Sequence, residues 1–288
     1  MTSLVLLRGR RGPTIFALLA ALCEVESQDL NSVVTVVDSF NHRVVVCPAS
    51  GGNCTTVAGG TGEGSGVASL RYPTGVIIAS DGRLVIADSH NSRIQACVAD
   101  GTGNCTTLAG GYGFGDGPRQ MSWPTGVALA ANGDLVVADM KNHRVLRCLP
   151  DGSRNCTVVA GGWGGGSNSQ QLYFPQDVAV ADNGDYVVAD VWNHRIQRCP
   201  ADDSGICLTV AGGKGRGNLS WQLDNPWSVS LGPGPNESYV VADYGNHRVQ
   251  LCPFSGTGNC TSVAGGRGLG FGPQQLNSPS GVSLLLLL

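Results

Sequence analysis

The chain has 288 residues, of which 42% are hydrophobic and 14% charged, and its formal net charge is −3. This hydrophobic content is sufficient for a packed core, so the composition excludes a wholly disordered chain. The slightly acidic balance, with Lys141 and Lys214 as the only lysines, disfavours a surface that follows nucleic-acid phosphates. We therefore expect no nucleic-acid partner.

Residues 1–27 have the pattern of a targeting leader. Arg8, Arg10 and Arg11 precede an apolar run at residues 15–23, and acidic residues follow. A basic start, a short apolar run and a polar exit are typical of a secretory signal peptide, although a disordered leader or an amphipathic transit peptide is an alternative. The run is too short to span a bilayer as a helix. We expect a secreted or secretory-lumen protein without a stable membrane span.

From about residue 32 to residue 288, one unit recurs at intervals of 50 to 53 residues. Its recurring members are Pro73, Pro124, Pro175, Pro226 and Pro279; Asp38, Asp88, Asp139, Asp190 and Asp243; and Ala-Gly-Gly triplets that begin at Ala58, Ala109, Ala160, Ala211 and Ala264. Repetition at a nearly fixed interval predicts a repeat architecture.

Residues 124–162 show the content of one unit. Apolar runs occupy residues 127–130, 135–138, 145–148 and 156–160, and Asn132-Gly133 between the first two is a hairpin turn pair. Four short runs per unit predict a four-stranded blade. A ring of such blades is a β-propeller, so the predicted fold class is all-β.

The two ends of the repeat region are predicted to complete one blade. Residues 33–60 supply only the second, third and fourth runs, and residues 279–288 supply only a first run. Pairing of the N- and C-terminal segments would close a five-bladed ring and leave no free edge strand. A six-bladed ring, or a fragment of one, is the alternative.

The turn after the second run carries the motif that identifies the repeat. It is Asn41-His42-Arg43, Asn142-His143-Arg144, Asn193-His194-Arg195 and Asn246-His247-Arg248, with Asn91-Ser92-Arg93 as a variant copy. With the preceding Asp, these segments resemble the NHL repeat family over about 250 residues. The resemblance implies a β-propeller, most often six-bladed, that serves as a platform for protein and sometimes RNA. This chain departs from it in its longer repeat and its cysteines.

The recurring histidines could be taken for a metal-binding ring. A residue that occurs at the same turn of nearly every blade is better explained by the same local role in each turn, in which Asp and Asn hold a tight conformation. Equivalent positions on separate blades are also too far apart for one ion with metal–nitrogen bonds of about 2 Å. We therefore predict no metal and no cofactor.

A ligand site is predicted on the face that carries these turns, which we call the top face. Positions that differ between blades should surround the mouth of the central channel there, and a constant frame with variable tips is how a scaffold carries a binding site. Variation among ordinary surface residues is the alternative. The candidate ligand-binding residues are Trp192, Trp227, Asp177, His90, Trp163 and Lys141.

Ten cysteines are predicted to form one disulfide per blade, because each pair stands at facing ends of the third and fourth runs. Free thiols or zinc ligation are alternatives, and disulfides would imply an oxidising compartment. The pairs are Cys47 with Cys54, Cys97 with Cys105, Cys148 with Cys156, Cys199 with Cys207, and Cys252 with Cys260. The remaining cysteine, Cys23, belongs to the leader.

Six asparagines stand in N-glycosylation sequons. They are Asn53, Asn104, Asn155, Asn218, Asn236 and Asn259. Four of them lie in the hairpins between the third and fourth runs, where Asn also suits a turn for its conformation alone. Glycans there would crowd the bottom face, opposite the top face, and leave the top face open.

These patterns favour a secreted, non-catalytic binding propeller that recognises a protein or glycan ligand on one face. The alternative is a propeller enzyme, either a lyase or a lactonase-like hydrolase. In the NHL-related amidating lyase, the zinc histidines follow the repeat Pro, and the matching residues here are Thr74, Thr125, Gln176, Trp227 and Ser280. None is His or Cys. A hydrolase would need carboxylates at the channel mouth, where only Asp177 clearly qualifies.

Overall fold

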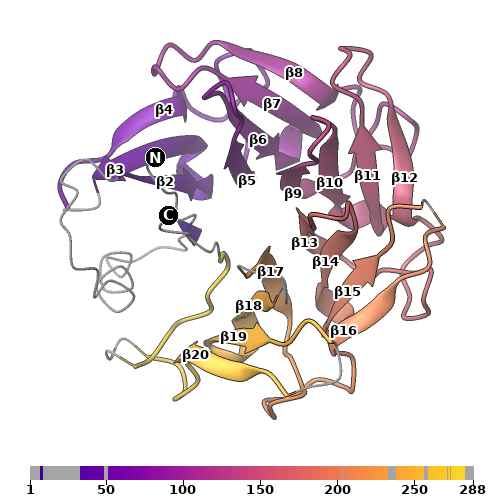
Figure 1. The fold of residues 1–288 in the computed structure, drawn as a ribbon. Helices are drawn as coiled ribbons and strands as arrows, with labels where there is room; N and C mark the ends of the chain where they lie inside the picture. Colours follow the sequence, from indigo (N-terminus) through magenta and orange to yellow (C-terminus); the bar gives the residue numbers. More distant parts are fainter. Residues whose placement is uncertain are drawn as a thin grey trace.

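The computed structural model describes residues 7–8, 33–48, 51–202, 204–232, 238–255, 259–270, 272 and 274–282. Within these ranges the strands form five four-stranded sheets arranged as a ring (Figure 1). The predicted five-bladed, all-β propeller is thereby confirmed. The apolar run of the predicted leader and Asn236 lie outside the described residues.

The blades follow one another in chain order. Blade 1 contains β1 (Leu7–Arg8), β2 (Val33–Asp38), β3 (Arg43–Pro48) and β4 (Thr55–Gly59). Blade 2 contains β5 (Pro73–Ile78), β6 (Leu84–Asp88), β7 (Arg93–Cys97) and β8 (Cys105–Gly110). Blade 3 contains β9 (Pro124–Leu129), β10 (Leu135–Asp139), β11 (Arg144–Cys148) and β12 (Cys156–Gly161). Blade 4 contains β13 (Pro175–Val180), β14 (Tyr186–Asp190), β15 (Arg195–Cys199) and β16 (Leu208–Gly212). Blade 5 contains β17 (Pro226–Leu231), β18 (Tyr239–Asp243), β19 (Arg248–Cys252) and β20 (Thr261–Gly265).

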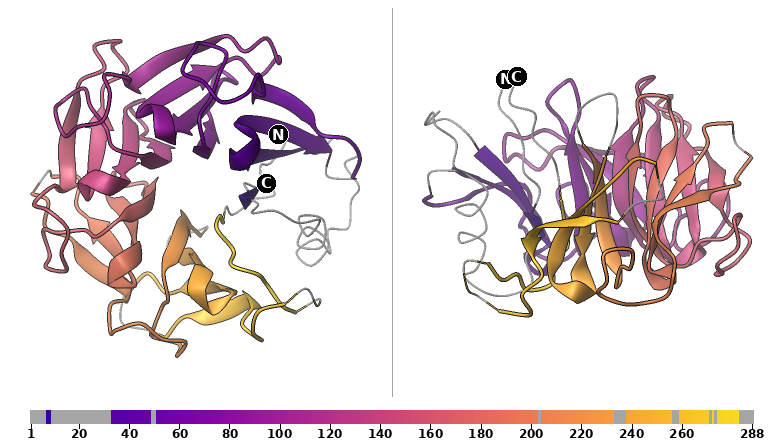
Figure 2. Two further views of the ribbon diagram at one scale, coloured as in Figure 1. Left: turned by 180° about the vertical axis from the view of Figure 1, so that it is seen from behind. Right: turned by 60° about the horizontal axis from the view of Figure 1, so that its bottom comes forward.

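The first strand of each blade lies nearest the ring axis and the fourth lies on the outside (Figures 1 and 2). A single turn of 3₁₀ helix joins the second and third strands of every blade. These turns are η1 (Ser39–Asn41), η2 (Ser89–Asn91), η3 (Met140–Asn142), η4 (Val191–Asn193) and η5 (Tyr244–Asn246). No helix among the described residues is long and apolar enough to cross a membrane.

The core lies between the faces of adjacent blades. Val85 and Ile94 of blade 2 share one buried cluster with Val127, Leu135 and Val137 of blade 3. Both faces of an interior blade pack in this way, and every residue of β10 is therefore buried. This explains why the second run of each unit is continuously apolar rather than alternating.

The ring closes differently from the other blade junctions. The first strand of blade 1 is β1, which comes from within the predicted leader and pairs in parallel with β2 through Leu7 and Val36. The first strand that we expected from residues 279–288 falls partly outside the described residues, and 279–282 form no strand. The segment nevertheless starts like an inner strand, because the Val282 N–H donates to Ser228 Oγ at 3.2 Å on β17.

All five predicted disulfides are present, with Cα–Cα separations of 4.0–4.2 Å. Each joins the third and fourth runs of its blade and closes a short loop. In the chain-entropy model, a loop of this length stabilises the fold by about 2.5 kcal/mol per bridge. Such a set of bridges indicates an oxidising secretory or extracellular environment.

Candidate functional site

A buried Asp organises the motif in blades 2 to 5. In blade 3, Asp139 accepts the Ser122 N–H through Oδ1 at 2.6 Å, and accepts Asn142 Nδ2 and Arg144 Nε through Oδ2, both at 2.8 Å. Arg144 donates its remaining N–H groups to the carbonyls of Asp116 and Gln120. These two residues lie in the crossover, the link between the fourth strand of one blade and the first strand of the next. We call this arrangement the Asp–Asn–Arg bracket.

The bracket is a structural device. Burial raises the pKa of Asp88, Asp139, Asp190 and Asp243, although hydrogen bonds from the bracket Asn and Arg act in the opposite direction. Each carboxylate accepts hydrogen bonds from three donors, one of them a backbone N–H of the crossover. The recurring Asp therefore holds the turn and the crossover together.

The motif histidines link neighbouring blades. Each stands in the left-handed region, with φ of 52° to 55°. Its Nδ1 accepts the N–H of the residue just before the next Pro, at 3.1 to 3.2 Å, in the pairs His42–Tyr72, His143–Phe174, His194–Asn225 and His247–Ser278. In blade 2 the equivalent residue is Ser92, whose buried hydroxyl has no partner among the described residues. The repeated local role predicted for these histidines is thus observed.

Aromatic side chains accompany these links on the top face. Phe40, Tyr72, His90 and Trp123 form successive ring contacts at centroid separations of 5.9, 4.5 and 4.5 Å. Lys141 places its Nζ 3.6 Å from the Trp123 ring centroid. This series connects blades 1, 2 and 3, and Trp123 contacts both the His90 imidazole and the Lys141 ammonium group.

Two further aromatic groups continue around the ring. Trp192 contacts Phe174 at 4.7 Å and Tyr173 at 5.2 Å. Trp227 stacks on Tyr244 at 4.7 Å. We call the three groups together the aromatic arc. Trp192 is 56% exposed and Phe40 is 50% exposed, so the arc offers apolar surface to a ligand.

The structure therefore gathers His90 and Lys141 on Trp123, and it places Trp192 and Trp227 in the neighbouring groups. Tyr72, Trp123 and Phe174 were not among the site residues predicted from the sequence. They share a position immediately before the repeat Pro and a left-handed φ of 46° to 55°. A bulky residue that recurs at this fixed position is the pattern that could have revealed them.

Asp177 lies on the first strand of blade 4, and its partner Ser228 follows Trp227 of the aromatic arc. Its Oδ2 accepts Ser228 Oγ at 2.6 Å and the Val229 N–H at 3.3 Å, and its Oδ1 accepts the N–H of Val178 at 3.0 Å. The carboxylate thus joins β13 to β17 between blades 4 and 5. Its local role is to connect inner strands.

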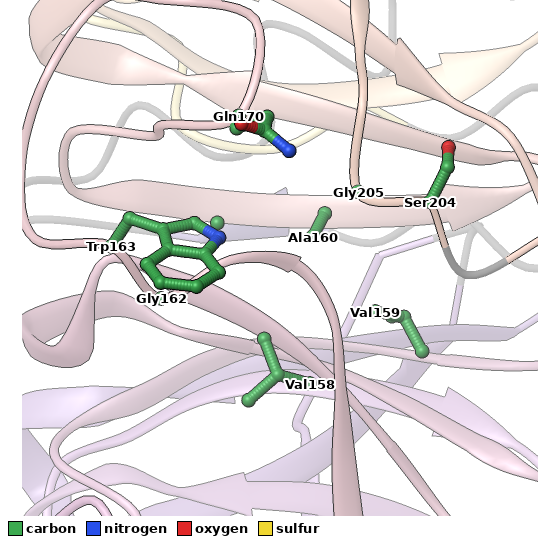
Figure 3. A pocket seen from close by; sticks show the side chains of 9 residues that line it. Val158, Val159, Ala160, Gly162, Trp163, Gln170, Ser204 and Gly205 are labelled. Atoms are coloured by element: carbon green, nitrogen blue, oxygen red, sulfur yellow. The ribbon is translucent and has the colours of Figure 1, made fainter.

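Trp163 follows β12, the outermost strand of its blade, and makes no ring contact with the arc among the described residues. It lines a pocket of about 290 Å³ at the junction of blades 3 and 4 (Figure 3). We call this cavity the rim pocket. Its lining residues are Val158, Val159, Ala160, Gly161, Gly162, Trp163, Gln170, Ser204 and Gly205.

Five sequon asparagines fall within the described residues, and all five are exposed. Asn53, Asn104, Asn155 and Asn259 lie at the ends of the hairpins between third and fourth strands, opposite the η turns, and Asn218 lies in a crossover. Their accessibility is compatible with glycan attachment, which stays a prediction. The described residues contain no group of three or more His, Cys, Asp or Glu side chains that could hold a metal ion.

Comparison with known proteins places these features in a family. The model of the NHL repeat matches residues 70–97, 121–148 and 172–199, which correspond to blades 2, 3 and 4. The Arabidopsis thaliana protein SUPPRESSOR OF QUENCHING 1, chloroplastic, is 33% identical over 128 residues. That similarity covers 38% of this chain and 12% of the plant protein, so this chain corresponds to a small part of that relative.

Solved propellers are similar in fold at low sequence identity. A chain from a crystal structure of the nidogen/laminin complex has a TM-score of 0.59 at 15% identity, over 87% of this chain and 83% of that chain. Virginiamycin B lyase from Staphylococcus aureus has a TM-score of 0.51 at 15% identity, over 82% of this chain and 67% of that chain. The three matches to the family model and the five-bladed ring support an NHL-repeat β-propeller.

Proposed function

We propose that the chain is a secreted, non-catalytic binding protein whose aromatic arc recognises a protein ligand. The observation that carries this proposal is that structural and exposed aromatic residues occupy different positions on the top face. The Asp, Asn, Arg and His of the motif are occupied in holding turns and crossovers, whereas the arc presents partly exposed aromatic groups that differ from blade to blade. Aromatic residues are enriched at the centres of protein interfaces and among the residues that dominate binding energy.

Two further observations support this proposal. The five disulfides and the leader pattern favour export. One structure similar in fold is a complex of nidogen with laminin, which is a precedent for protein binding by such a ring. A glycan bound by the arc is the alternative ligand.

The enzymatic alternative has weaker support from the inner strands. Asp177, the carboxylate that a hydrolase at the channel mouth would use, is engaged by Ser228 and two backbone N–H groups. Thr74, one of the residues that follow the repeat Pro, donates to the Thr125 carbonyl at 3.0 Å. Both side chains thus have structural partners between blades, which favours binding over chemistry despite the similarity in fold to a lyase.

The test is a comparative capture experiment with the secreted protein. Wild type, Trp192→Ala, Phe40→Ala and the control Val263→Ala, which changes an exposed residue of β20, would be immobilised and incubated with an extracellular extract. Each retained protein would then be purified and its affinity measured. We expect a partner whose affinity falls at least about tenfold in the arc variants, as expected for an aromatic anchor, and is unchanged in the control. No such partner, or equal losses in the control, would contradict the proposal.

A further inference from the structure

The indole of Trp163 is presented to solvent without a covering group. Gly162 and Gly164 flank it with φ of 86° and 78°, a conformation that glycine adopts readily, and the Trp163 carbonyl accepts Gln171 Nε2 at 3.2 Å. The side chain is 74% exposed. At the equivalent position of blade 2, Arg119 covers the Tyr112 ring at 4.7 Å. No ring or cation contact to Trp163 is found among the described residues.

The rim pocket lies beside this indole and is lined by groups from two blades. Val158 and Ala160 of β12 supply apolar surface, Gln170 comes from the crossover, and Ser204 comes from the hairpin that precedes β16 (Figure 3). The Cys207 N–H donates to the Ser169 carbonyl at 2.7 Å, which fixes the crossover against that hairpin. The pocket wall is therefore built by a defined contact between blades.

The size and neutrality of the rim pocket restrict its ligand. A volume of about 290 Å³ is just below the range of small-molecule sites, about 300–1,000 Å³. None of the nine lining residues is charged, and a charged group bound against uncharged walls would lose hydration without gaining a partner. The nearby Asp202 carboxylate, which accepts the Ser204 N–H at 2.9 Å, also disfavours an anion.

The polar side chains of the rim pocket exclude a purely apolar ligand. The exposed Gln170 amide offers two donors and an acceptor, and the Ser204 hydroxyl accepts the Ile206 N–H at 3.3 Å while its own proton stays available to donate. A ligand that covered these groups without hydrogen-bonding to them would bind at a desolvation cost. A saccharide ring combines an apolar face of C–H groups with a rim of hydroxyls, which matches an indole face beside an amide and a hydroxyl.

We propose that the rim pocket binds a single neutral pyranose ring, stacked on Trp163 and hydrogen-bonded by Gln170 and Ser204. This site is separate from the aromatic arc, and it does not depend on the function proposed for the arc. It gives the chain a second specificity, for neutral glycans, on the outer side of the ring.

The experiment uses saturation-transfer-difference NMR on the secreted, enzymatically deglycosylated full chain, so that its own glycans do not occupy the site. The probes are methyl β-glucopyranoside, methyl β-galactopyranoside, methyl α-mannopyranoside and N-acetylglucosamine, titrated into the millimolar range. We expect at least one probe to bind saturably, and Trp163→Ala to weaken its binding by roughly tenfold or more. Trp163→Phe should lose less saccharide affinity than Trp163→Ala. Ser204→Ala should weaken saccharide binding by roughly threefold.

Tyr112→Ala is the matched control, since it removes the half-exposed aromatic ring at the equivalent position of blade 2, and it should leave saccharide binding unchanged. Circular dichroism checks that each variant is folded. The proposal is overturned if no probe binds saturably, or if Tyr112→Ala and Trp163→Ala weaken saccharide binding equally. A result in which no saccharide binds, but Trp163→Ala abolishes binding of a protein partner, would assign the rim pocket to that partner and overturn the proposal as well.

Discussion

Blade 1 and blade 3 contain the same bracket residues, yet the structure uses them to different extents. Arg43 bonds Asp38 at 2.8 Å, and Arg144 bonds Asp139 at the same distance. The Arg43 and Asp38 side chains are 39% and 26% exposed, whereas those of Arg144 and Asp139 are 7% and 0% exposed. The contribution of a repeated motif to stability therefore depends on what covers it.

The difference arises from the crossover. In blade 3 the guanidinium of Arg144 also holds two crossover carbonyls, while Arg43 donates its further N–H to Thr56 Oγ1 within its own blade. Because the crossover shields this ion pair from water, removing one partner leaves the other partner as a buried, unpaired charge. An exposed pair of the same geometry contributes little because solvent screens it.

The largest expected effect is the difference in stability between the bracket arginine variants of blades 3 and 1. Arg144→Ala should lower the free energy of unfolding by about 3–5 kcal/mol, because it leaves the Asp139 carboxylate buried without its cation. Arg43→Ala should lower it by about 1 kcal/mol or less. Guanidinium unfolding of both variants, followed by circular dichroism, measures the difference. Equal losses would show that the crossover adds nothing to the bracket.

Removing the disulfide of blade 1 or that of blade 3 should have the same effect on stability. Replacing Cys148 and Cys156 by Ser should reduce the free energy of unfolding by about 2.5 kcal/mol, and replacing Cys47 and Cys54 should reduce it by about the same amount, because the closed loops have similar lengths. The same unfolding measurement checks both variants. A much smaller loss in blade 1 would indicate that this blade opens before the rest of the ring.

The histidine links predict a dependence on pH. Burial lowers the pKa of His143 and of His194, and a protonated Nδ1 cannot accept the N–H of the next blade. Since the folded pKa lies below the unfolded value of about 6.5, the unfolded chain binds more protons between these values. The stability contributed by the neutral rings is thus present above about pH 6.5, and it is lost as the pH falls through the folded pKa.

The free energy of unfolding of wild type and of His143→Gln, measured from pH 7.5 to pH 5, isolates this effect. The advantage of wild type over the variant should shrink as the pH falls. Comparing the two proteins cancels contributions from the buried carboxyl groups, whose raised pKa acts in the opposite sense. An advantage that is constant over this range would show that the Nδ1 acceptor has no role in stability.

The smallest expected effect concerns the variant link in blade 2. Ser92 has φ of 53° and a buried hydroxyl without a partner among the described residues. Ser92→Gly removes that hydroxyl and relieves the left-handed backbone, so we expect a gain of about 0.5–1 kcal/mol despite the greater freedom of the unfolded chain. Thermal unfolding measures the gain, and a net loss would indicate an unseen partner for Ser92 Oγ.

The repeat frame was predictable because its information is local. Pro124 begins β9, Asp139 ends β10, and Cys148 faces Cys156 across a hairpin, and each of these features follows from strand alternation and short turns. The contact of Trp123 with His90, by contrast, joins residues 33 positions apart on different blades, and their approach depends on the twist between sheets.

Two other features lay beyond sequence reasoning for the same reason. We expected Trp163 beside the other candidates at the channel mouth, but its position after an outermost strand places it in the rim pocket. Asp177 was expected to face a ligand, and the structure shows it bonded to Ser228, which is 51 residues further along the chain. Neither outcome can be derived from spacing alone, because both depend on which strand of a neighbouring blade lies alongside.

The most direct test of the division between frame and binding surface measures stability and affinity on the same variants. Trp192→Ala should leave the free energy of unfolding within about 0.5 kcal/mol of wild type, as expected for an exposed side chain. The same variant should lower the affinity for the captured partner at least about tenfold, as measured by biolayer interferometry. Unchanged affinity for every partner of the wild-type protein, or a loss of stability comparable to that of Arg144→Ala, would contradict the assignment of the aromatic arc to ligand binding.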